Sequence, residues 1–133
     1  MLSLFPQILF LSPLAITLLR IVLACYMTYI AWHLLNKHAE IERVPLPLIG
    51  NAKPWMVWLS AIIIAATSAL IFIGAWTQIA ALLASITLLK HLVYFRRYHA
   101  VLPFPKSTYI LLLCIALTLI VSGAGAFAFD LPL

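Results

Sequence analysis

Arg20 and Asp130 are the two residues whose positions point most directly to chemistry. Arg20 lies seven residues inside an apolar stretch that begins at Pro13, about 10 Å along a helix that rises about 1.5 Å per residue. A charge there costs at least a few kcal/mol unless it is paired or its side chain reaches a polar surface. Asp130 follows the last apolar stretch and is the only acid outside residues 36–53. We therefore expect an Arg20–Asp130 ion pair, either structural or the floor of a site for an anion or a quinone. A lone Arg20 that reaches the surface is the alternative.

His33 and His91 form a second candidate pair, at similar depths in two apolar stretches. Two inward histidines at matched depth could ligate a b-type haem, relay protons or simply form hydrogen bonds within a bundle. Haem is not favoured, because neither stretch contains the glycines that usually line such a site. No metal site and no resident cofactor are predicted, and a quinone remains the open alternative.

The sequence offers no recognisable catalytic motif. It has no Cys-x-x-Cys, no glycine-rich phosphate loop, no Ser/His/Asp arrangement and no pair of acids within an apolar stretch. Cys25 and Cys114 are expected at different depths, too far apart for a disulfide. Lys90 is expected to extend toward the membrane surface. Catalytic residues therefore stay unassigned, and whether the chain is an enzyme stays open.

Four apolar stretches must position these residues. They are Pro13–Leu35, Pro54–Trp76, Thr77–Phe95 and Thr108–Phe129. A helix needs about 20 residues to cross a hydrocarbon core of about 30 Å, and each stretch is near that length. The chain is 66% hydrophobic and 8% charged, which excludes a soluble globular domain and a disordered chain. We expect a single all-α transmembrane domain over residues 1–133, an integral membrane four-helix bundle in up-down-up-down order.

The basic residues predict how this domain is oriented. The two longer loops between the stretches carry six of them, and the segments on the other side carry none. They are Lys37, Arg43, Lys53, Arg96, Arg97 and Lys106. The positive-inside rule then makes these loops cytoplasmic and both termini extracytoplasmic, in a bacterial or archaeal inner membrane. The net charge of +5 is thereby assigned to topology, and no nucleic-acid partner is expected.

Small and polar residues at helical spacing predict the packing faces, because helices in lipid approach most closely where side chains are small. In the second stretch this pattern comprises Ala61, Ala65 and Ser68, and in the fourth Thr118, Ser122 and Gly125. The residues expected to pack between helices are Ala84, Gly123 and Gly125. The polar residues expected to face inward are Thr17, Thr28, His33, Thr87, His91 and Ser122. Leu112 is expected on the opposite face of its helix.

Three segments together resemble a known family. They are Leu18–Leu23 (LLRIVL), Leu70–Thr77 (LIFIGAWT) and Ser122–Asp130 (SGAGAFAFD). These resemble the start of span 1, the hairpin and the tail of the DoxX family of small four-span membrane proteins. The chain departs from the family pattern at Gln78, where an arginine is frequent, and at Ile30–Ala31, where a His-Gly pair is usual. Its second apolar stretch also lacks the glutamate that many members carry.

The resemblance implies a role in redox chemistry. Some DoxX members are subunits of a thiosulfate:quinone oxidoreductase, and others associate with redox or thiol-stress proteins. The first hypothesis is a small integral subunit of, or anchor for, a quinone-linked or thiol/sulfur redox system. The alternative is a non-catalytic accessory or packing protein, and a haem b electron-transfer subunit is third. The expected partners are the lipid bilayer and either an oxidoreductase subunit, soluble or membrane-bound, or further copies of the chain.

Overall fold

The computed structural model describes residues 11–43, 45–46, 50–51 and 53–123. The regular secondary structure of these residues is helical, as predicted, apart from one antiparallel pair of two-residue strands. The helices are α1 (Ser12–Asn36), α2 (His38–Ile41), α3 (Pro54–Ile73), α4 (Thr77–Val93), α5 (Phe95–Tyr98) and α6 (Lys106–Ser122). The strands are β1 (Pro45–Leu46) and β2 (Gly50–Asn51).

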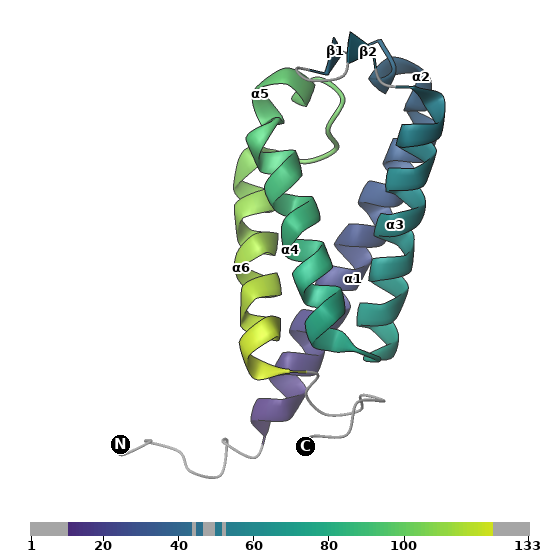
Figure 1. The fold of residues 1–133 in the computed structure, drawn as a ribbon. Helices are drawn as coiled ribbons and strands as arrows, with labels where there is room; N and C mark the ends of the chain where they lie inside the picture. The colour runs from purple at the N-terminus through teal and green to yellow at the C-terminus, as the bar shows by residue number, and fades with distance from the viewer. Residues whose placement is uncertain (1–10, 44, 47–49, 52, 124–133) are drawn as a thin grey trace.

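The four longer helices α1, α3, α4 and α6 lie lengthwise beside one another (Figure 1). The short elements α2, β1, β2 and α5 gather at one end of these helices, here called the loop end. The connection from α3 to α4 lies at the other end, here called the turn end.

Proline and glycine set several helix limits. Proline lies within the first two positions of α1 and of α3, where its missing N–H costs nothing. Helix α3 ends at Gly74, whose φ of 75° lies in the left-handed region that favours glycine. The N–H groups of Gly74 and Ala75 both donate to the carbonyl of Leu70, at 2.9 and 3.2 Å. Only three residues then separate α3 from α4, so the two helices form the expected hairpin.

The helices are shorter than three of the predicted stretches. Helix α3 ends at Ile73 instead of Trp76, because Gly74 terminates it. Helix α4 ends at Val93 instead of Phe95, and Tyr94 separates it from α5. Helix α6 begins at Lys106 and ends at Ser122. The remainder of the fourth predicted stretch, residues 124–129, lies outside the described residues.

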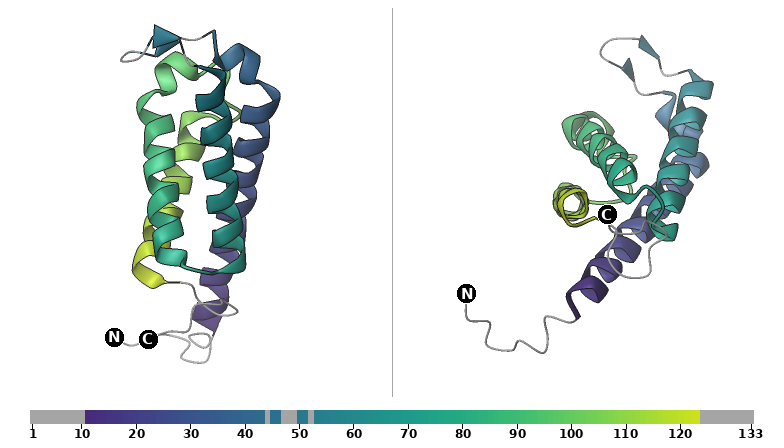
Figure 2. Two further views of the ribbon diagram at one scale, coloured as in Figure 1. Left: turned by 45° about the vertical axis from the view of Figure 1, so that its right-hand side comes forward. Right: turned by 60° about the horizontal axis from the view of Figure 1, so that its bottom comes forward.

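The long helices associate as two close pairs. Helix α1 packs along α3, and α4 packs along α6. Figure 2 shows, in its right-hand view, the two pairs as separate layers. The buried core runs through both pairs and includes Leu23 and Met27 on α1, Ile64 on α3, Leu88 on α4 and Leu112 on α6.

Two of these helices are long and apolar enough to cross a membrane, namely α1 with 25 residues and α3 with 20. Helices α4 and α6 are also apolar but have 17 residues each. Large apolar side chains lie on the outer faces of all four. Examples are Trp32, Phe72, Leu89 and Val121, the last of which is 86% exposed.

Candidate functional site

Arg20 is buried on α1, with only 3% of its surface exposed. It shares a helix face with the buried residues Leu23 and Ala24. Thr17, three residues earlier, is half-buried and donates its hydroxyl to the carbonyl of Pro13 at 2.9 Å. The burial of Arg20 fits the inward position that its partnership with Asp130 requires. Asp130 itself lies outside the described residues, so the ion pair stays a prediction.

The α1–α3 interface contains a small polar cluster, formed by Thr28, Ser68 and the carbonyl of Ala24. The two hydroxyl oxygens are 2.6 Å apart, and each also lies within 2.9 Å of the Ala24 carbonyl oxygen. Each hydroxyl group has one proton to donate, so two protons are shared among these three short contacts. Ser68 is buried and Thr28 lies at the exposed edge of the interface. The cluster thus joins α1 to α3 through side chains that the sequence placed on packing faces.

His33 connects α1 to the segment between α5 and α6. Its Nε2 lies 2.8 Å from the carbonyl oxygen of Val101, so Nε2–H is the donor. Tyr29 stacks against the same imidazole, with ring centroids 6.4 Å apart, and also contacts Phe104 at 5.2 Å. The half-buried position agrees with the inward orientation predicted for His33. Nδ1 is the ring nitrogen left outside this hydrogen bond.

His91 lies in the α4–α6 interface at the same end of the molecule. Its Nδ1 donates to the carbonyl of Thr87 at 2.7 Å. Its ring lies parallel to that of Tyr109 on α6, with an interplanar angle of 2° and centroids 5.9 Å apart. The Tyr109 hydroxyl is buried and makes no hydrogen bond with any described residue. His91 and Tyr109 therefore place two polar atoms, Nε2 and the phenol oxygen, inside a largely apolar interface.

A metal centre is not visible in the part of the chain that the structure describes. No group of three or more His, Cys, Asp or Glu side chains is placed to hold an ion there. Cys25 and Cys114 are both free and exposed on helix surfaces. The haem hypothesis for His33 and His91 stays open, since each imidazole keeps one ring nitrogen outside its backbone hydrogen bond.

The predicted packing face of α6 is wrong, although the one on α4 is right. Ala84 is fully buried on α4, beside the equally buried Ala80 and Ala81. On α6, however, Ser122 is exposed, and Leu112, expected to face outward, is 1% exposed. The physical reason is that an alanine surface on α4 already permits close approach. Large α6 side chains can therefore fill the interface, and small ones are not needed on both helices.

Gly123 does not serve as a packing residue. Its φ of 73° requires the conformational freedom of glycine as α6 ends. A Cβ added there would meet no described atom within 4 Å, so no close helix contact depends on it. Gly125, also predicted to pack between helices, lies outside the described residues.

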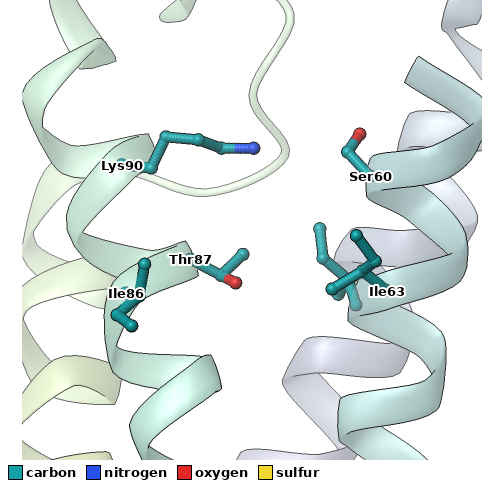
Figure 3. A pocket seen from close by; sticks show the side chains of 6 residues that line it. Ser60, Ile63, Ile86, Thr87 and Lys90 are labelled. Carbon is teal, nitrogen blue, oxygen red and sulfur yellow. The ribbon is translucent and has the colours of Figure 1, made fainter. Parts of the chain in front are cut away.

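A pocket of about 180 Å³ lies between α3 and α4, where the two close pairs face each other. Its lining comprises Ser60, Ile63 and Ile64 from α3 and Ile86, Thr87 and Lys90 from α4. Figure 3 shows that the Lys90 side chain extends across this space toward α3 rather than along α4. The sequence pattern did not predict this site, because Lys90 was expected to extend toward the membrane surface. The available signal was the spacing of Thr87 and Lys90, which puts them on one helix face.

No family model, curated protein or solved structure matches this chain. The resemblance to the DoxX family therefore rests on the sequence motifs alone.

Proposed function

We propose that the chain is an integral membrane four-helix bundle in up-down-up-down order. The supporting observation is the row of large apolar side chains on the outer face of each long helix, which water would not favour. Helices α4 and α6, at 17 residues, cover about 25 Å. A hydrocarbon core of about 30 Å can adapt to this by local thinning, at a modest cost per Å of mismatch.

The loop end is the cytoplasmic end in this proposal. Lys37 and Arg43 flank α2, Lys53 precedes α3, and Arg96 belongs to α5. All of these segments lie at the loop end (Figure 1), so the basic residues gather on one side. Both termini then face the extracytoplasmic side of a bacterial or archaeal inner membrane.

Cysteine labelling tests this orientation. Cys25 and Cys114 are first replaced by alanine, and Ser3→Cys and Asn51→Cys are introduced separately. An impermeant thiol reagent should label Ser3→Cys on intact cells and Asn51→Cys only after permeabilisation. The reverse pattern would overturn the orientation.

Within this bundle, we propose that the chain is a small subunit of, or anchor for, a quinone-linked or thiol/sulfur redox system. The observation that carries the proposal is Arg20, a cation buried on α1. A guanidinium within a span is costly, and intramembrane charges commonly mark binding sites. With Asp130 as its expected partner, it offers hydrogen-bond donors to an anion or to a quinone carbonyl oxygen. The DoxX resemblance supplies the redox context.

Purification from native membranes in mild detergent tests the redox role. Native protein, Arg20→Gln and the control Arg43→Gln would be compared for co-purified proteins and extracted quinone. Arg43 is exposed at the loop end, so its change removes the same charge elsewhere. We expect Arg20→Gln alone to lose partner or quinone. Equal recovery in all three would contradict a binding role for Arg20.

A non-catalytic accessory protein is the second candidate, and Gln78 favours it. Its amide nitrogen donates to the carbonyl of Ile120 at 3.4 Å, linking α4 to α6. The position where DoxX members often carry arginine thus holds a structural contact here. In this case Arg20 and Asp130 would only fix helices together. A double-mutant cycle measures their coupling, and a value of about 1 kcal/mol or more with no bound quinone supports this candidate.

The haem b hypothesis is the third and has the simplest test. An absorbance spectrum of the purified protein would show a Soret band if His33 and His91 ligated a haem. Loss of that band in His33→Ala and in His91→Ala would assign the ligands. A spectrum with no band from protein purified under haem-replete conditions would end this hypothesis.

A further inference from the structure

The α3–α4 pocket, lined by the six residues given above, joins a cation to an apolar wall. Lys90 lies three residues before the end of α4, about 5 Å from it along the helix. Figure 3 shows its ammonium group directed toward the side of α3 that carries Ser60. Ile63 and Ile86 form the wall nearer the turn end and are 45% and 58% exposed, so the pocket opens sideways between the helices.

The charge in this pocket is not balanced by the protein residues that the structure describes. The ion pair found among them joins Lys37 to Glu40, on the exposed surface. The described acids, Glu40 and Glu42, belong to the α2 region and do not line the pocket. A cation that faces an apolar wall at this depth favours an anionic occupant.

The two hydroxyl groups of the pocket also remain able to accept hydrogen bonds. Ser60 donates its proton to the carbonyl of Val57, and Thr87 donates to the carbonyl of Leu83, both at 2.8 Å. Their oxygen lone pairs can accept from an occupant that carries hydroxyl groups. The pocket therefore offers one cationic donor and two neutral acceptors above an apolar surface.

The volume and shape restrict the class of occupant further. About 180 Å³ corresponds to roughly six water molecules, too little for a whole lipid and enough for part of one. A free inorganic anion would leave the isoleucine wall uncovered. A neutral quinone would leave the Lys90 charge uncompensated. An amphiphile with an anionic head and an aliphatic chain satisfies both ends.

We propose that the α3–α4 pocket binds one anionic phospholipid of the phosphatidylglycerol type. The phosphate contacts Lys90, the glycerol hydroxyls donate to Ser60 and Thr87, and an acyl chain lies over Ile63 and Ile86. Basic pockets between spans near the cytoplasmic surface commonly bind anionic headgroups. This inference rests on the proposed membrane placement but does not depend on the redox role.

Native mass spectrometry in mild detergent tests the inference, with phosphatidylglycerol and phosphatidylcholine of equal chain length as probes. We expect native protein to retain one phosphatidylglycerol in preference to phosphatidylcholine. Lys90→Gln should weaken this binding about fivefold, the effect of one basic residue at a membrane surface. Lys106→Gln is the matched control, since Lys106 is exposed at the same end and does not line the pocket.

A second pair of variants fills the pocket without a change in charge. Ser60→Leu should displace the lipid, whereas Thr118→Leu, a hydroxyl loss on the exposed face of α6, should not. Equal retention of the two lipids by native protein, or undiminished binding by Lys90→Gln, would overturn the inference. Displacement of phosphatidylglycerol by inorganic phosphate or by a short-chain quinone would also overturn it.

A separate experiment tests the proposed membrane placement independently of the lipid site. The expressed chain is first washed with alkaline carbonate, which removes peripheral proteins from membranes. A chain released by this wash would refute the membrane proposal itself. A chain that resists the wash but shows no lipid preference would refute only the lipid site.

Discussion

Helix α3 has one serine facing α1 and another facing α4, and the two serines form different hydrogen bonds. Ser68 faces α1 and donates across the interface to the carbonyl of Ala24 at 2.7 Å. Ser60, eight residues earlier, lines the pocket toward α4 and donates to Val57 of its own helix. The same residue type thus closes one interface and leaves the other open.

The difference lies in what each serine meets. Ala24 is small and buried, so the backbone of α1 comes close enough to accept a hydrogen bond from α3. Opposite Ser60 stand Ile86, Thr87 and Lys90, whose larger side chains line a cavity between the helices. A serine in a span is therefore not by itself a sign of tight packing. The partner face decides whether its hydroxyl joins two helices.

The largest effect expected from this comparison follows an increase in volume. Ala24→Leu should destabilise the protein by about 1–3 kcal/mol, because the close α1–α3 interface has no space for the added carbons. Ser60→Leu adds comparable bulk to the α3–α4 pocket and should be neutral or stabilising. Unfolding in mixed micelles of increasing SDS content measures both. Similar losses at the two sites would show that the α3–α4 pocket is not open in solution.

The sequence predicted helix identity, the hairpin and half of the packing faces. Pro13 and Pro54 correctly marked the starts of α1 and α3, because proline suits a first helical turn. Ala61, Ser68 and Ala84 were placed on packing faces and are buried. These successes share one cause, since helices in lipid approach one another most closely where side chains are small.

The remaining errors concern interfaces, where the buried face of one helix depends on the residues of its partner helix. Ala65 was expected to pack, yet it is exposed, and α3 instead buries Ile64 and Ile71. On α6 the small Thr118 is exposed while Leu112 is buried. Residue size on one helix does not reveal whether its partner already supplies a small surface. The direction of Lys90 was missed for the same reason, because the pocket exists only between two helices.

A smaller effect is expected when the hydroxyl groups themselves are removed. Ser68→Ala should cost about 0.6 kcal/mol and at most about 1.7 kcal/mol, the range for hydrogen bonds between membrane helices. Ser60→Ala should change stability by less, because it removes a bond to the helix's own backbone and leaves no partner on another helix unpaired. The same SDS unfolding assay applies to both. In Ser68→Ala, Thr28 remains to donate to the Ala24 carbonyl. A larger loss of stability in Ser60→Ala than in Ser68→Ala would contradict the comparison.

The smallest effect concerns Tyr109 in the α4–α6 interface, which combines close packing with an unused polar group. Its ring is fully buried and stacks on His91, while its hydroxyl makes no hydrogen bond with the described residues. A buried hydroxyl without a partner has lost its hydrogen bonds to water and has gained none in the protein. Its removal should therefore not lower the stability of the fold. Tyr109→Phe is therefore expected to leave the unfolding free energy unchanged within about 0.5 kcal/mol or to raise it slightly.

Tyr109→Leu serves as the control, because it also removes the stacked ring and should lose about 0.5–1.5 kcal/mol of stability beyond any change in buried area. If Tyr109→Phe proved as harmful as Tyr109→Leu, the hydroxyl would have a partner in the membrane-embedded protein. The α4–α6 interface would then resemble the α1–α3 interface, where hydroxyl groups and close packing act together.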